Sequence, residues 1–254
     1  MVRCIQTGAV RAKRGERGFR RYLLDDWSDR ALPVNCFLLE RADGLVLFDT
    51  GQTAAAASSS YFPRWHPYLR LARFELGAGD EVAAQVRALG HDTAEVRMVV
   101  LSHLHTDHTG GLAPFARAEV IVSRVEWQRA TGLTGRLRGY LPQRWPPGLH
   151  PRLADFDGPA IGPFPASSDL AGDGQLILVP TSGHTPGHAA LLARDGERRY
   201  LFAGDIAHTA ADVAPDLAAW ARNECVTVLT AHDGKAAHLI RVPPWEPSPG
   251  SNEL

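Results

Sequence analysis

The segment 102–111, Ser-His-Leu-His-Thr-Asp-His-Thr-Gly-Gly, gathers metal-binding side chains at close spacing. Three histidines and one aspartate fall within six positions: His103, His105, Asp107 and His108. Neutral imidazole and carboxylate are good ligands for zinc and similar divalent ions. Because a chain that leaves a strand can turn alternate side chains toward one point, this segment is a concentrated source of ligands. The alternative interpretation is a set of surface histidines that cap a helix.

Three more candidate ligands stand far along the chain, and each lies in the turn after a predicted strand. They are His184, Asp205 and His232. Each one alone would be an ordinary loop residue, but the repeated placement after strand ends favours ligands. A carboxylate such as Asp205 can bridge two cations, because it neutralises charge where the ions sit close together. We therefore predict two divalent ions, most readily zinc, with manganese, iron or cobalt as alternatives.

Strands and one helix are predicted to position these residues. Short apolar runs of strand length, bounded by turn residues, occur at 34–39, 45–48, 96–101, 118–123, 176–180, 189–193, 199–203 and 226–230. The first two flank an Asp43-Gly44 turn and predict a hairpin. Asp80 is predicted to cap a helix that runs to about Leu89, in which Val82, Val86 and Leu89 fall on one face. Gly110 and Gly111 are predicted to let the backbone turn and start a helix beneath the metals. The mixture indicates a layered α/β fold with its site on one rim.

The motifs resemble those of the metallo-β-lactamase-fold hydrolases, and most of all the branch of N-acyl homoserine lactone lactonases. The resemblance covers about residues 30–235. It rests on five features: Asp-Thr-Gly at 49–51, the His-rich segment, Gly-His-Thr-Pro-Gly-His at 183–188, Gly204-Asp205 and the late His232. It implies an αββα sandwich of two mixed β-sheets flanked by helices, with the site at one edge of the sheets.

The resemblance also implies a role for each motif residue. One metal would be held by His103, His105 and His184, the other by Asp107, His108 and His232, with Asp205 between them. Asp49 and His188 would support the ligands without touching the metal. His66, His91, His150 and His238 match no motif and are interpreted as surface or packing residues.

One departure from the lactonase pattern concerns the residue three positions after the bridging aspartate. Lactonases of this branch usually carry a tyrosine there, which meets the substrate carbonyl, whereas this chain has His208. An imidazole can donate a hydrogen bond to the same oxygen in the right protonation state. We count His208 with Asp107 as candidate catalytic residues, and the alternative is that His208 has no role.

The implied chemistry is hydrolysis of an ester-type bond. Two metals about 3.5 to 4 Å apart would share a water whose pKa falls toward neutrality, so that a bridging hydroxide attacks the carbonyl carbon. Asp107 would orient this hydroxide as well as bind metal. The favoured substrate is neutral with an apolar group, plausibly an N-acyl homoserine lactone, because no arginine cluster near the motifs indicates a phosphate clamp. The alternatives on the same site are a glyoxalase-type thioesterase, a β-lactam hydrolase and an organophosphate hydrolase.

Composition limits the other classes of function. The 254 residues carry a net charge of −1, with 44% hydrophobic and 22% charged residues, so no basic field would collect nucleic acid or an anionic membrane. Three widely spaced cysteines form neither a disulfide framework nor a thiolate site. No signal peptide or membrane span is predicted, and a cytoplasmic location is the default. We expect a single domain over 1–254 that acts as a monomer or a homodimer.

Three other classes of protein are alternatives to a lactonase-like hydrolase. Nucleases with this fold usually add a further domain and a basic channel, and the near-neutral charge argues against that class. The flavin-linked redox branch usually replaces an early ligand with an acid, and this sequence has no such replacement. A metal-bearing binding protein without activity is a third possibility, although all seven expected ligands are present.

The aromatic segments 52–75 and 131–168 are predicted either to wall the substrate site or to pack the core or a dimer interface. The tail after about residue 242 is predicted to be poorly ordered.

Overall fold

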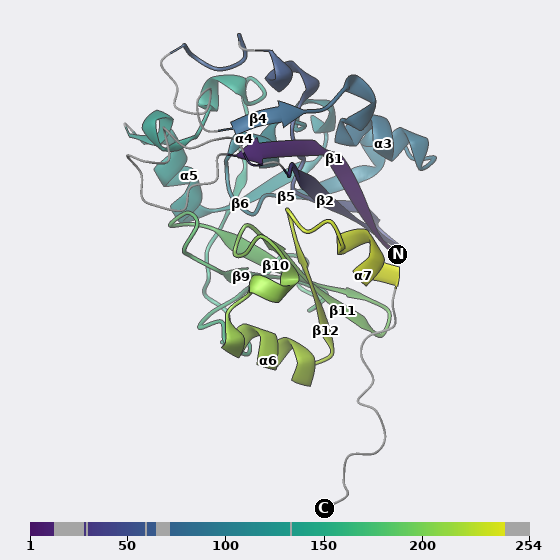
Figure 1. The fold of residues 1–254 in the computed structure, drawn as a ribbon. Coiled ribbons are helices and arrows are strands. Elements are labelled where there is room, and N and C mark those ends of the chain that lie inside the picture. The colour runs from purple at the N-terminus through teal and green to yellow at the C-terminus, as the bar shows by residue number, and fades with distance from the viewer. Residues whose placement is uncertain (13–27, 29, 59, 65–71, 133, 242–254) are drawn as a thin grey trace, which may run out of the picture.

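The computed structural model describes residues 1–12, 28, 30–58, 60–64, 72–132 and 134–241. Within these residues two β-sheets pack face to face, and helices cover their outer sides (Figure 1). Each sheet contains both parallel and antiparallel neighbours. The arrangement confirms the predicted αββα sandwich of two mixed sheets.

The first sheet has seven strands in the order β4-β1-β2-β3-β5-β6-β7. Their bounds are β1 (Val2–Ala12), β2 (Leu32–Arg41), β3 (Gly44–Phe48), β4 (Ala72–Glu75), β5 (Val96–Val100), β6 (Glu119–Ser123) and β7 (Arg152–Ala154). The predicted hairpin is confirmed as β2 and β3. Strand β1 was not predicted, because its polar residues hide the apolar pattern, yet it pairs with β2 and β4 on either side.

The second sheet has five strands in the order β12-β11-β10-β9-β8. Their bounds are β8 (Ser168–Asp169), β9 (Leu176–Pro180), β10 (Ala189–Asp195), β11 (Arg198–Gly204) and β12 (Val226–Thr230). Neighbours are antiparallel except β11 and β12, which are parallel. The four longer strands confirm the predicted strands of this half of the chain.

Alternation along the strands divides the core into layers. Between the sheets, Phe37 of β2 stacks on Phe202 of β11, with ring centroids 5.0 Å apart. On the outer face of the first sheet, Leu38 and its neighbours pack against helix α3 (Val82–Ala88). On the outer face of the second sheet, buried side chains pack against helix α6 (Pro215–Asn223).

The remaining helical segments are short. Helix α7 (Ala236–Arg241) packs against β1 and β12. The others are α4 (Thr106–Thr109), α5 (Arg124–Thr131), η1 (Ala54–Ala57), η2 (Ala78–Asp80), η3 (Thr93–Glu95), η4 (Ala113–Phe115), η5 (Gly135–Arg138), η6 (Pro142–Arg144) and η7 (Ala210–Asp212), where η marks a 3-10 helix. Over the part of the chain described, no helix is long and apolar enough to cross a membrane.

Two predicted helix starts are wrong. Glu81 occupies the N-cap position of helix α3 without a side-chain capping hydrogen bond, whereas Asp80 ends η2 and accepts a hydrogen bond of 2.7 Å from the Gly77 N–H. Val82 and Val86 are buried as predicted, but Leu89 follows the helix and is 39% exposed. Near the His-rich segment, α4 begins at Thr106, before the two glycines, so Asp107 and His108 lie inside the helix.

The predicted aromatic segments pack mainly into the protein interior. Tyr61, Phe62 and Phe74 form one buried cluster, and Trp145 stacks on Trp127. This supports the packing interpretation for these residues rather than the substrate wall. Trp65, His66 and Tyr68, and the tail after residue 242, lie outside the described residues.

Candidate metal centre

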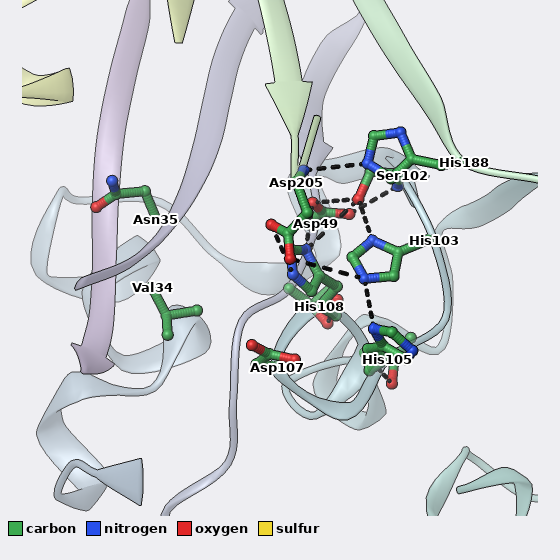
Figure 2. A network of polar contacts seen from close by, with 12 residues as sticks. Val34, Asn35, Asp49, Ser102, His103, His105, Asp107, His108, His188 and Asp205 are labelled. Carbon is green, nitrogen blue, oxygen red and sulfur yellow. Dashed lines mark hydrogen bonds and ion pairs between the residues drawn. The ribbon is translucent and has the colours of Figure 1, made fainter. Parts of the chain in front are cut away.

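The site lies where β3, β5, β9, β11 and β12 end. Asp49 follows β3, the His-rich segment follows β5, and the other three predicted ligands follow β9, β11 and β12. Side chains from both sheets therefore meet at one edge of the sandwich (Figure 2).

All seven predicted ligands come together in three overlapping groups, each with its ligand atoms within 4.8 Å of one another. The first group is His103, His105 and His184; the second is His103, His108 and Asp205; the third is Asp107, His108 and His232. Six of the seven are buried or half-buried, whereas His184 is exposed, so the site opens to solvent on the side of His184.

The two oxygens of Asp205 face different groups. Oδ2 lies 3.5 Å from His184 Nε2 and 4.0 Å from His103 Nε2. Oδ1 lies 3.3 Å from both His108 Nε2 and His232 Nε2. A carboxylate placed in this way can give one oxygen to each of two ions.

Hydrogen bonds fix the tautomers in the first group. Ser102 Oγ donates to Asp49 Oδ2 at 2.8 Å, so we assign it as the acceptor of the His103 Nδ1–H at 3.0 Å. His105 Nε2–H donates to the Arg138 carbonyl oxygen at 3.2 Å. In the neutral rings, His103 Nε2 and His105 Nδ1 therefore carry lone pairs.

These two lone pairs face each other at a distance of 3.0 Å. His105 Nδ1 also lies 3.0 Å from His184 Nε2. Two nitrogen lone pairs at this distance repel each other unless a cation lies between them. The ligand atoms of one tetrahedral zinc ion are roughly 3.3 Å apart when each zinc–nitrogen bond is about 2.05 Å. The first group fits a metal ion better than it fits a hydrogen-bond network.

The histidines near Asp205 Oδ1 are oriented by partners outside the site. His108 Nδ1–H donates to Asp49 Oδ2 at 2.8 Å, and His232 Nδ1–H donates to the Pro33 carbonyl oxygen at 2.8 Å. Both Nε2 atoms are thus free to bind a metal. His108 Nε2 and Asp205 Oδ1 are buried, and neither has a hydrogen-bond partner among the described residues. Orphaned buried polar atoms are costly, and a cation between them would satisfy both.

The pKa shifts divide the site into two electrostatic halves. Burial, together with the neighbouring histidines, holds the pKa of His103 well below its usual value, and burial lowers that of His105 to about 4. Burial also acts to lower the pKa of His232, but the Asp205 carboxylate outweighs it and raises this pKa to about 9. Burial likewise acts to lower the pKa of His108, but the carboxylates of Asp205, Asp49 and Asp107 outweigh it and hold this pKa well above its usual value. This half of the site attracts positive charge, which a divalent ion can supply.

Local backbone shape places the supporting residues. Asp49 has a φ of 59°, and its carboxylate accepts from the Ser102 N–H at 2.8 Å as well as from His108. Gly204 has a φ of 52°, and a Cβ there would lie 2.7 Å from His188 Nε2, so glycine is required before Asp205. His188 accepts a 3.1 Å hydrogen bond from the Asp205 N–H and contacts Thr181 Oγ1 through Nδ1. Asp49 and His188 thus hold predicted ligands in place, which is the supporting role that the resemblance implies for them.

The second candidate catalytic residue, His208, is exposed and lies beside the site. Its ring centroid is 6.5 Å from that of His232. Of the histidines without motif support, His91 lies near Glu40 and Glu95, and His238 is exposed on α7.

Several groups that support the site were not predicted from the sequence. The carbonyl oxygens of Pro33 and Arg138 orient two histidines, and no sequence signal marks a carbonyl group. Glu126 accepts a hydrogen bond from the Leu104 N–H, between two predicted ligands. A Ser-x-x-Glu pattern at 123–126 was available, but it marks a helix start rather than a site residue.

Comparison with known proteins identifies the family to which the chain belongs. A model described as the metallo-beta-lactamase superfamily matches residues 29–244. The chain belongs to the metallo-beta-lactamase superfamily. This confirms the predicted fold class and the predicted class of metal-dependent hydrolase.

Within the metallo-beta-lactamase superfamily, the chain is similar to the N-acyl homoserine lactonase AttM of Rhizobium radiobacter. The two are 33% identical over 195 residues, which cover 72% of this chain and 68% of the relative. A probable metallo-hydrolase, Rv2300c of Mycobacterium tuberculosis, is 35% identical over 69% of this chain and 57% of its own length. The resemblance to the lactonase branch is thereby confirmed.

Solved structures agree on the fold. An N-acyl homoserine lactone hydrolase with the product N-hexanoyl-L-homoserine at its catalytic metal centre aligns with a TM-score of 0.73. The alignment covers 96% of this chain and 97% of that chain, at 20% sequence identity.

Proposed function

We propose that the chain is a dinuclear metal-dependent hydrolase that opens the lactone ring of N-acyl homoserine lactones. The observation that carries the proposal is the position of Asp205, whose two oxygens face two separate groups of imidazole and carboxylate ligands. The names of the relatives support the choice of substrate.

Each residue of the site has a role in this proposal. His103, His105 and His184 would hold one ion, and Asp107, His108 and His232 the other, with Asp205 shared. Ions held there would supply an activated water as nucleophile and a Lewis acid for the carbonyl oxygen. Asp107 and Asp205 would orient the nucleophile through their carboxylate oxygens. His208 would donate a hydrogen bond to the substrate carbonyl oxygen from its place beside His232.

One exposed apolar side chain precedes a residue whose backbone contacts the site. Leu137 is 68% exposed and precedes Arg138, whose carbonyl oxygen contacts His105. In this proposal the acyl chain of the substrate would contact Leu137.

The decisive experiment combines metal analysis with a substrate series. We expect the zinc-loaded protein to hold about two ions and to hydrolyse acyl homoserine lactones of several chain lengths faster than a thioester, a β-lactam or a phosphotriester. Asp205→Ala should lower both the metal content and the turnover rate by about two orders of magnitude or more, because the substitution removes a ligand that both ions would share. His238→Ala, a histidine exposed on α7, is the control and should match the wild type.

Two outcomes would contradict the proposal in different ways. Wild-type turnover in metal-replete Asp205→Ala would refute the site. A preference for the thioester, the β-lactam or the phosphotriester would keep the site and replace the substrate. If the protein binds two ions but hydrolyses none of these substrates, the alternative of a metal-bearing binding protein without activity would be favoured.

A further inference from the structure

Glu126 is a completely buried carboxyl group close to the ligand segments, and the proposed chemistry does not use it. It lies in the first turn of α5, where Ser123 caps the helix by accepting from the Glu126 N–H at 3.1 Å. A glutamate at this position often turns back to the capping residue. Here its two oxygens instead point away from the helix toward two other segments.

One oxygen of Glu126 holds the segment after β5. Oε1 accepts a 3.0 Å hydrogen bond from the Leu104 N–H. Leu104 is buried and lies between His103 and His105, so this bond fixes the backbone from which both imidazoles project.

The other oxygen holds the segment after β9. Oε2 accepts from Thr185 Oγ1 at 2.8 Å and from the Gly187 N–H at 3.3 Å. Thr185 follows His184 directly, so the same carboxyl group also fixes the third member of the histidine group.

Close packing shows that this contact is built into the fold. A Cβ on Gly187 would lie 2.1 Å from the Glu126 backbone nitrogen, so only glycine lets the segment approach α5. Ser123 Oγ donates to the Gly187 carbonyl oxygen from the same helix end. Tyr140, whose ring centroid is 5.3 Å from that of His105, lies near Glu126 as well; burial first, and then the Glu126 carboxylate, raise the pKa of Tyr140.

We propose that Glu126 is a positioning residue that sets the spacing of the His103, His105 and His184 nitrogens and thereby the affinity of this half of the metal centre. The proposal rests on the dinuclear site proposed above. The other half depends on different partners, since Asp49 orients His108 and the Pro33 carbonyl oxygen orients His232. A change at Glu126 should therefore weaken one half of the centre selectively.

Glu126→Gln tests this with little change in volume. Its amide oxygen can keep the bond to one segment, but its NH2 group must then face an N–H donor of the other. Zinc is titrated into metal-free protein against a chromophoric chelator, while imidazole 15N NMR signals report which histidines bind. We expect the affinity reported by His105 and His184 to fall by about 10- to 100-fold, as for other partners that orient ligands. The affinity reported by His108 and His232 should change by less than about twofold.

Two further variants complete the design. Thr185→Val removes one hydrogen bond to Oε2 and keeps the carboxyl group, so it should weaken the same histidine group by a smaller factor, even if Glu126→Gln does not fold. Glu197→Gln makes the same chemical change at an exposed position and should match the wild type.

The outcomes separate this inference from the proposed function. Equal zinc affinity of wild type and both test variants, or an equal loss in both halves, overturns the role of Glu126 and leaves the dinuclear site in place. Failure of the wild-type protein to bind zinc overturns both.

Discussion

At the scale of single residues, hydrogen-bond partners outside the site select which nitrogen each proposed ligand histidine presents to it. The Arg138 carbonyl oxygen accepts a hydrogen bond from His105 Nε2–H, which leaves Nδ1 for the site. Asp49 Oδ2 and the Pro33 carbonyl oxygen accept from the Nδ1–H groups of His108 and His232, which leaves Nε2. Such partners fix ring orientation and raise ligand basicity. The chemistry of each histidine is thus set by its neighbours as much as by its own type.

His208 belongs to this scale, because its role depends on a single hydrogen bond to the substrate. If it donates to the developing oxyanion, His208→Ala should lower kcat by about 10-fold or more, since a hydrogen bond to a charged group is worth about 1.5–3 kcal/mol. KM should change little, because the bond strengthens in the transition state. Steady-state kinetics on an acyl homoserine lactone measure both. An unchanged kcat would show that His208 has no catalytic role.

At the scale of elements, the segment after β9 must pass very close to the start of α5. Gly187 has no room for a side chain, whereas a Cβ on Gly183 in the same segment would meet no atom within 4 Å. The Gly-His-Thr-Pro-Gly-His motif therefore contains two glycines with different constraints. The second sets the distance between two elements.

Gly187→Ala should destabilise the protein by about 1–3 kcal/mol, because the added methyl group forces backbone atoms apart. Gly183→Ala is the matched control in the same segment and should stay within about 0.5 kcal/mol of the wild type. Urea unfolding of the two variants under identical metal conditions gives the comparison. Equal stabilities would mean that the segment moves away from α5 without cost.

At the scale of the whole molecule, the proposed metal centre joins the two sheets. His103, His105, Asp107 and His108 follow β5 of the first sheet, whereas His184, Asp205 and His232 follow β9, β11 and β12 of the second. Ions bound between them would hold the sandwich closed at this edge. Metal binding should therefore contribute to the stability of the entire fold.

Chelator treatment should lower the stability by about 4 kcal/mol per site when free zinc is initially about 1,000-fold above its Kd. For a chain of this size each kcal/mol corresponds to a fall in Tm of about 2–4 °C. Calorimetry with and without chelator measures the shift. Asp205→Ala should show a much smaller shift, and an equal shift in this variant would argue that the metal acts elsewhere.

Local sequence patterns predicted much of this architecture. Apolar runs between turn residues located β2, β3, β5, β6, β9, β10, β11 and β12, because alternation and burial leave a short-range signal. They missed β1, whose polar residues obscure the pattern, and the short strands β4, β7 and β8, and they misplaced the starts of α3 and α4. The start of α3 carries no side-chain cap to mark it, because Glu81 occupies the N-cap position without a side-chain capping hydrogen bond, and Asp80 belongs to the preceding turn.

The ligand types were readable from the sequence because metal chemistry demands particular side chains at the ends of strands. The assignment of all seven ligands, and of one domain over the whole chain, stays a prediction. Only the tertiary structure decided how these residues are supported. Pro33, Arg138 and Glu126 are 199, 33 and 22 residues away in sequence from their hydrogen-bond partners His232, His105 and Leu104. These contacts arise from the packing of strands and helices. A backbone carbonyl, or a glutamate at a helix start, gains its role from its neighbours in space, and a linear pattern does not contain that information.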